Sequence, residues 1–244
     1  MNFKIINIKA VEAAQVRMAP QGFRYGYLEN FFKKDVYHQL VITYPDINDF
    51  KLAVKSIPGN SYKRFYVGPV YYSSKNLGCF CHFSVSDIWR QAINELTSPE
   101  FINILQQTTD IKFNNCSNLG FSYGKEGCVQ ETHLDGAVRA NDQSSIHSTI
   151  ACLLYLNEQP GGSTGTYICD KEKKQIIFKT PNLRNSFMFF EQHPQAWHGF
   201  PPVPAGEDRR IISLAFNWQK KPLHMRTSIF HKTLCPYVIQ PLNE

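Results

Sequence analysis

Hydrophobic positions recur with two different periods along the 244-residue chain. In the first half, apolar residues three to four positions apart are typical of amphipathic helices, and they cover residues 31–41, 86–96 and 98–105. The third segment begins at Ser98-Pro99, where Ser98 can cap the helix N-terminus and Pro99 suits the first helical position. The pattern therefore predicts three helices before residue 110.

From about residue 110 the period changes to that of β-strands, with short apolar or alternating runs between turn residues. The runs are Leu119–Tyr123, Val129–Asp135, Ser148–Leu156, Thr166–Cys169, Gln175–Lys179, Ser186–Phe190 and Arg210–Trp218. Short strands in succession with no helix between them predict an antiparallel sandwich or barrel. Helices followed by strands give an α+β order with a mainly β core, in which the helices buttress the sheet.

No repeat, low-complexity tract or linker divides the sequence, so we expect a single domain. Its helix-rich part would span about residues 1–109, its β core about 110–220, and a C-terminal extension 221–244. The stretch 57–83 is rich in Tyr, Gly, Pro and Ser and reads as a loop or irregular strand. It is too long for a plain connector, and long loops are often functional, although the sequence assigns it no role.

Composition narrows the class of protein. With 43% hydrophobic and 19% charged residues the chain is too apolar to be disordered, and no apolar run reaches the ~20 residues of a membrane helix. The N-terminus lacks a secretory signal, so we expect a cytoplasmic protein. The net charge of +6 comes from dispersed Lys and Arg, so nucleic acid is not an expected partner. The seven cysteines show no zinc-ribbon spacing, and we expect buried, reduced thiols.

The strongest chemical pattern is His133-Leu134-Asp135. On a strand, residues i and i+2 point to the same face, so His133 and Asp135 would present an imidazole and a carboxylate side by side. A further histidine, His198, follows a later apolar strand. Two histidines and one carboxylate on one side of a metal are the arrangement expected of non-haem Fe(II) oxygenases.

Other interpretations of these histidines stay open at the level of sequence. His133 could be a surface histidine on an edge strand, with Asp135 as a turn acceptor. His193, in a polar turn before Pro194, and His147, on the approach to a strand, are alternative third ligands.

An arginine eleven residues after His198 suggests an anion site. Alternation on this strand places Arg209 and Ser213 on one face and Arg210 on the other. A guanidinium near a hydroxyl can clamp a carboxylate through charge-assisted hydrogen bonds. A bulge between the two arginines would invert the faces and make Arg210 the anchor instead.

At these positions the sequence resembles the Fe(II)/2-oxoglutarate-dependent oxygenase superfamily, and within it the prolyl-4-hydroxylase-like branch. The matching motifs are Tyr123-Gly124-x-x-Gly127, His133-x-Asp135, Leu154-Tyr155-Leu156-Asn157, Gly161-Gly162, Phe189, His198-Gly199-x-x-Pro202-Val203 and Arg209-x-x-x-Ser213. Two N-terminal segments, Tyr27–Phe32 and Leu96–Phe101, also look like that branch. The resemblance covers most of the chain and implies a double-stranded β-helix, which is a jelly-roll or cupin-like fold.

The resemblance implies roles for the residues that match. His133, Asp135 and His198 would hold Fe(II), and 2-oxoglutarate would bind the iron through its keto and adjacent carboxylate oxygens. Its far carboxylate would pair with Arg209, assisted by the hydroxyls of Ser213 and Tyr155, and Tyr123 would be a further cosubstrate contact.

The same resemblance implies a reaction. O2 would be consumed, succinate and CO2 released, and a hydroxyl group placed on a substrate carbon. Related halogenases have a small residue where this chain has Asp135, so a carboxylate there favours hydroxylation, or alternatively desaturation or cyclisation.

The substrate is the open question at this stage. We expect an amino acid or related small metabolite, free or carrier-bound, because the chain has no appended recognition domain. A peptide or protein side chain, as in prolyl hydroxylation, is the alternative, and a non-catalytic β-barrel binding module is the alternative of another class. Arg139, six residues past His133, is a candidate contact for an acidic substrate group. Oligomeric state is not indicated.

Overall fold

The structure is a computed structural model that describes residues 3–56, 61–74, 77–80, 85–135, 148–170, 172 and 175–218. Its helices are α1 Ile8–Glu12, α2 Lys34–Ile42, α3 Asp87–Leu96 and α4 Pro99–Thr109, with a 3-10 turn at Ile47–Asp49. The strands of the first half are β1 Gln15–Met18, β2 Arg24–Glu29, β3 Lys51–Lys55, β4 Tyr62–Ser74 and β5 Leu77–Phe80. The remaining strands are β6 Asn115–Gly124, β7 Val129–His133, β8 Ser148–Leu156, β9 Tyr167–Cys169, β10 Ile176–Lys179, β11 Arg184–Glu191, β12 Trp197–Phe200 and β13 Arg209–Asn217.

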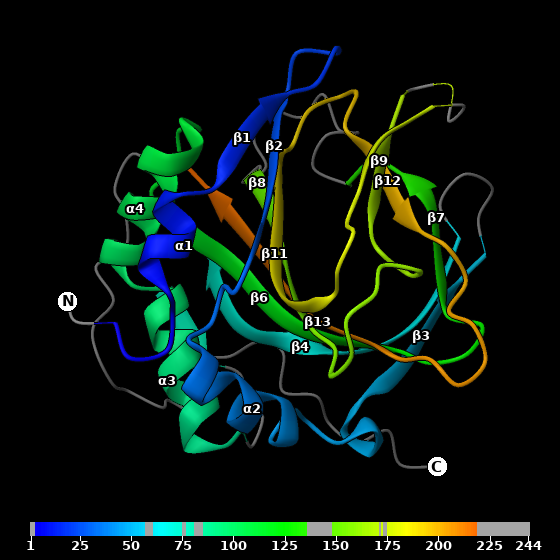
Figure 1. The fold of residues 1–244 in the computed structure, drawn as a ribbon, viewed down its shortest axis with the longest axis horizontal. Helices are drawn as coiled ribbons and strands as arrows, with labels where there is room; N and C mark the ends of the chain where they lie inside the picture. Colours follow the sequence, from blue (N-terminus) through cyan, green and yellow to red (C-terminus); the bar gives the residue numbers. More distant parts are fainter. Residues whose placement is uncertain are drawn as a thin grey trace.

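These strands form one antiparallel sheet that curls over on itself (Figure 1). Its order is β1-β2-β11-β8-β13-β6-β4-β7-β12-β9-β10, with β3 and β5 paired to β4. The curl brings the short strands β7, β12 and β9 opposite β8 and β11, as Figure 1 shows. A mainly β, jelly-roll-like fold with helices on one side is therefore confirmed.

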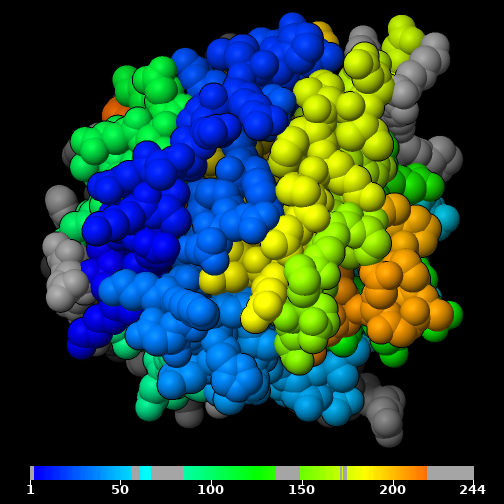
Figure 2. Space-filling view, in the orientation of Figure 1, coloured from blue at the N-terminus to red at the C-terminus, as the bar shows by residue number. Residues whose placement is uncertain are grey.

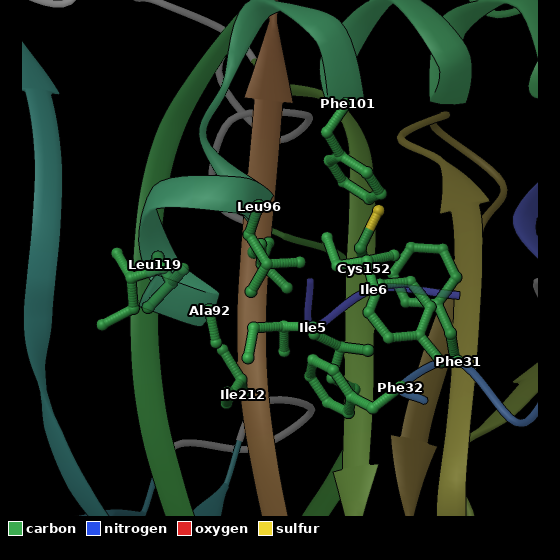
Figure 3. Close-up of a cluster of buried hydrophobic side chains, with 14 of the residues drawn as sticks. Ile5, Ile6, Phe31, Phe32, Ala92, Leu96, Phe101, Leu119, Cys152 and Ile212 are labelled. Carbon is green, nitrogen blue, oxygen red and sulfur yellow. The ribbon is translucent and has the colours of Figure 1, made fainter. Parts of the chain in front are cut away.

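The helices pack on the outer face of the long strands and form the main core there. Ser98 caps α4 as expected, because its hydroxyl accepts the backbone N–H of Phe101 at 3.1 Å. Figure 3 shows Leu96 and Phe101 pointing from the helices toward Ile212 and Cys152 on the strands. Even-numbered residues of β13 thus face the helices, which leaves its odd-numbered residues for the inside of the curl.

The N-terminal segments close one side of the molecule. Figure 2 shows residues of the first fifth of the chain, in blue, covering much of this face. Glu95, which is 5% exposed, fixes this segment by accepting backbone N–H groups of Lys4, Ile5 and Ile6 at 2.8–3.2 Å.

The first half contains more strand than its apolar periodicity predicts. The stretch read as a loop or irregular strand, 57–83, contains the described strands β4 and β5, and β4 is a central member of the sheet. Its Tyr-rich sequence shows little apolar–polar alternation, yet it pairs with β3, β5, β6 and β7 along its length. The strand β12 is short, four residues, and was not predicted.

The described cysteines agree with the expectation of buried thiols. Cys116, Cys128, Cys152 and Cys169 are buried. Burial raises the pKa of the Cys116 thiol to about 12, so it stays protonated at neutral pH. No helix in the described part of the chain is long and apolar enough to cross a bilayer.

Candidate metal and anion site

Three potential metal ligands meet inside the curl of the sheet. His133 is the last residue of β7, Asp135 lies two residues beyond it, and His198 is on β12. His133 and His198 occupy paired positions of the two antiparallel strands, and their ring centroids are 4.3 Å apart. The Asp135 Oδ1 atom lies 3.7 Å from His133 Nε2 and 3.6 Å from His198 Nε2. One ligand atom from each residue falls within 4.8 Å of the others.

Backbone carbonyls orient both imidazoles. The Nδ1 atom of His133 lies 2.9 Å from the carbonyl oxygen of Glu131, and that of His198 lies 3.0 Å from the carbonyl oxygen of Ala196. A hydrogen bond donated by Nδ1 leaves Nε2 unprotonated and free to ligate. Both rings therefore turn Nε2 toward Asp135.

The protonation states suit metal binding. Burial lowers the pKa of His198, more than Asp135 raises it, so its imidazole is neutral at pH 7. Burial raises the pKa of Asp135, but the neighbouring His198 and His133 outweigh this effect and lower that pKa to about 2. The group thus offers the neutral imidazole of His198 and the ionised carboxylate of Asp135, beside the imidazole of His133.

This donor set fits Fe(II). Bonds of about 2.1 Å at right angles require ligand atoms about 3 Å apart, slightly less than the 3.6 and 3.7 Å separations here. Two histidines and one carboxylate on one face leave the other coordination positions open, the arrangement of non-haem Fe(II) oxygenases.

Gln192 is a site residue that sequence reasoning missed. Its Nε2 atom donates to Asp135 Oδ2 at 2.6 Å, and its side chain lines a cavity together with His133, Asp135 and His198. The bond leaves Asp135 Oδ1 free to face the two imidazoles. It reaches Asp135 from the segment after β11, and no spacing in the sequence reveals such a contact.

Replacing Gln192 with methionine should weaken metal binding about 10- to 100-fold, because a partner that orients a ligand carboxylate is lost. Titration of the apoprotein with Co(II) or Fe(II) under anaerobic conditions measures this affinity. Gln195→Met is the matched control, since Gln195 is exposed and its backbone N–H bonds His193 instead. Equal affinities of the Gln192 and Gln195 variants would contradict the assignment.

Arg209 lies at the start of β13 and is only 4% exposed. Its Nε atom donates to the carbonyl oxygen of Thr164 at 2.9 Å, and Nη2 donates to the hydroxyl of Thr166 at 2.6 Å. The guanidinium carbon lies 3.9 Å from the Phe200 ring centroid. Burial lowers the pKa of Arg209 to about 10, so it is still charged at neutral pH.

No carboxylate among the described residues lies within ion-pair distance of Arg209, although Arg210 has two. A buried cation without a counter-charge destabilises the folded protein, and a bound anion offsets this cost. Arg209 and the metal ligands line a common cavity of about 440 Å³. The structure thus places a buried guanidinium without a described carboxylate partner and a convergent His-Asp-His group in one cavity.

The other predicted cosubstrate contacts divide into two kinds. Ser213 lines the cavity on the same face as Arg209, and its hydroxyl donates to the Gly120 carbonyl at 3.3 Å. Tyr155 is fully buried behind the cavity wall, where its hydroxyl lies 3.2 Å from that of Thr180. Its ring centroid lies 5.6 Å from the Arg209 guanidinium carbon, and its hydroxyl is near enough to Arg209 to raise the pKa of that arginine, against the larger effect of burial. Arg209 also donates to the hydroxyl of Thr166, a contact that alternation along β13 could not indicate.

Tyr123 is not brought to the cavity. Its ring lies 6.1 Å from that of Phe50 in the main core, and its hydroxyl lies 3.4 Å from Asp208. Arg139 and His147 lie outside the described residues.

The alternative candidates from the sequence lie elsewhere. His193 stacks on Phe23 with ring centroids 5.9 Å apart, away from the His133–Asp135 pair. Arg210 points out of the cavity and pairs with Asp208 at 2.8 Å and Glu158 at 3.1 Å. No bulge separates the two arginines, so the faces follow simple alternation.

Comparison with known proteins gives a match in structure only. No protein-family model matches the sequence, and a search of curated proteins found no match. A Pseudomonas putida prolyl-4-hydroxylase is 14% identical, with a TM-score of 0.52 over 80% of this chain and 92% of that one. The viral collagen prolyl hydroxylase of Paramecium bursaria Chlorella virus-1, solved as a 2-oxoglutarate complex, is 16% identical, with a TM-score of 0.51 over 80% and 96%.

A third structure has a different activity. The non-haem α-ketoglutarate-dependent epimerase SnoN from nogalamycin biosynthesis is 8% identical, with a TM-score of 0.52 over 80% of this chain and 77% of that one. At such low identity these likenesses establish the fold. The chain has the fold of the 2-oxoglutarate- and Fe(II)-dependent oxygenases, as its sequence motifs imply.

Proposed function

We propose that this protein is an Fe(II)- and 2-oxoglutarate-dependent dioxygenase that hydroxylates an unactivated C–H bond and releases succinate and CO2. The observation that carries the proposal is the shared cavity. It holds a convergent His133, Asp135 and His198 group together with the buried guanidinium of Arg209, which has no carboxylate partner in the described part of the chain. A dicarboxylate that chelates a metal with one end and needs a cation at the other matches both features.

Each residue has a role in this proposal. Iron, when bound, supplies the site at which O2 and 2-oxoglutarate react. His133, Asp135 and His198 hold it, and Gln192 fixes the carboxylate of Asp135. Arg209, with Thr166 and Ser213 nearby, receives the far carboxylate of 2-oxoglutarate and so sets its orientation. A carboxylate at position 135 leaves no room for a halide ligand, which favours hydroxylation or the related desaturation and cyclisation reactions.

We propose an amino acid or related small metabolite as the substrate, free or carrier-bound. The cavity of about 440 Å³ is near the lower end of the 300–1,000 Å³ range of ligand pockets, and the cosubstrate occupies part of it. A peptide or protein side chain is the second candidate, because two solved proteins of this fold are prolyl hydroxylases, one of them for collagen.

Two measurements test the activity. Adding 2-oxoglutarate to the Fe(II)-loaded protein without oxygen should produce a visible metal-to-ligand charge-transfer band, and adding air should release succinate. A band without succinate, under every substrate condition tried, would favour a non-catalytic binding module. Absence of the band would show that the site assignment is wrong.

A further inference from the structure

A second arginine, Arg64, lines the same cavity and has no role in the site described above. It comes from β4, within the stretch whose function the sequence left open. Its guanidinium carbon lies 5.1 Å from the ring centroid of Tyr62 and 5.5 Å from that of Tyr66. Both tyrosines also line the cavity, so the rings hold the cation on the cavity side of the strand.

Arg64 is partly buried, and its buried Nε atom lacks the partner that such a donor normally has. Its Nε atom is buried without a hydrogen-bond partner, and no described carboxylate lies within ion-pair distance of it. Buried donors in proteins are almost always satisfied, so such a group calls for a ligand. The stacking on tyrosine rings orients Arg64 but satisfies none of its N–H groups.

The cavity therefore has more positive charge than the cosubstrate uses. In the proposed function, one carboxylate of 2-oxoglutarate lies at the metal and the other at Arg209. Arg64 remains over. The charge of Arg64 is also one of the causes, after burial, that lower the pKa of Arg209, so the two cations repel each other until anions enter.

We propose that Arg64 binds the carboxylate of the primary substrate, which is a small free carboxylic acid such as an unblocked amino acid. This inference rests on the proposed function and specifies the substrate class of that site. A single guanidinium matches the charge of one carboxylate and can bond it in a bidentate manner. The small cavity favours a free acid over the side chain of a folded protein.

The test compares free acids with their neutral counterparts in the Fe(II)-loaded enzyme. Succinate release is measured with the standard L-amino acids, with the corresponding amino-acid amides, and with peptides blocked at both ends. We expect stimulation by one or more free acids and none by the matching amides. In Arg64→Gln, the KM for the stimulating acid should rise about 30-fold or more, because the carboxylate loses its charged partner. Arg64→Lys keeps the positive charge but cannot form the two parallel hydrogen bonds of a guanidinium, so its KM for the acid should lie between those of the wild type and Arg64→Gln.

Two controls separate this inference from the proposed function. Lys63→Gln alters an exposed, neighbouring residue of β4 and should change neither the KM for the stimulating acid nor the KM for 2-oxoglutarate. The charge-transfer band and the 2-oxoglutarate KM should remain within about threefold of the wild type in Arg64→Gln, since Arg209 is intact. If the wild-type protein shows neither band nor succinate, the proposed function itself fails.

Several results would overturn the role of Arg64 while the proposed function stands. These are stimulation by amides equal to that by acids, stimulation by blocked peptides alone, or no stimulation by any free acid. An unchanged KM for the acid in Arg64→Gln is a fourth. A raised KM for 2-oxoglutarate alone would also overturn it and assign Arg64 to the cosubstrate.

Discussion

Replacing His198 with alanine should abolish Fe(II) binding and succinate release. The variant loses one of the three proposed ligands, and we expect the remaining His133 and Asp135 to hold the metal far more weakly. Loss of a residue that merely orients a ligand costs about 10- to 100-fold in affinity, so loss of the ligand itself should cost more than about 100-fold. Anaerobic metal titration and the charge-transfer band with 2-oxoglutarate measure the loss.

His193→Ala is the matched control for this prediction, because His193 stacks on Phe23 and is the other histidine on the same stretch of chain. It should bind Fe(II) as the wild type does. The reverse result, with His193→Ala defective and His198→Ala normal, would show that the wrong third ligand was chosen. Thermal unfolding of both apoproteins checks that the difference concerns the metal and not folding.

Replacing Arg209 with glutamine should raise the KM for 2-oxoglutarate about 30-fold or more. The substitution leaves the far carboxylate of the cosubstrate buried without its counter-charge, and truncating one partner of a buried ion pair costs about 2–5 kcal/mol. Arg209→Lys keeps the charge but loses the bonds to Thr164 and Thr166, so we expect a smaller rise. Initial rates of succinate release against 2-oxoglutarate concentration give both values.

The adjacent Arg210 provides the control, since it pairs with Asp208 and Glu158 outside the cavity. Arg210→Gln should leave the KM for 2-oxoglutarate unchanged. An unchanged KM in Arg209→Gln would remove Arg209 from the cosubstrate site. Fe(II) affinity without 2-oxoglutarate should be the same in both variants, which separates this effect from damage to the metal ligands.

The sequence predicts which side chains of the proposed site share a face, because simple strand geometry controls this. His133 and Asp135 are two residues apart and face one way, although β7 itself ends at His133. The same alternation places Arg209 and Ser213 in the cavity and Arg210 outside it. The alternation of residues along one strand is sufficient to predict which side chains share a face of the sheet.

Contacts between distant segments are not accessible to that reasoning. Gln192 reaches Asp135, and Thr166 bonds Arg209, through pairings that depend on how the sheet curls. The motif that contains Tyr155 likewise does not indicate that its hydroxyl lies 3.2 Å from the hydroxyl of Thr180, a residue of a distant segment. The sequence does not indicate Arg64 as a cavity residue, because the apolar pattern around it does not predict the strand β4.

The pairing of β7 with β12 links assembly of the proposed metal site to folding of the chain. An unfolded chain offers His133 and Asp135 as a two-ligand pair, whereas His198 joins them only after these two distant strands have come into register. The three side chains of the proposed site therefore come together only when the chain folds. Metal bound there as proposed should stabilise the closed sheet by mass action, so the free energy of unfolding should rise with metal concentration.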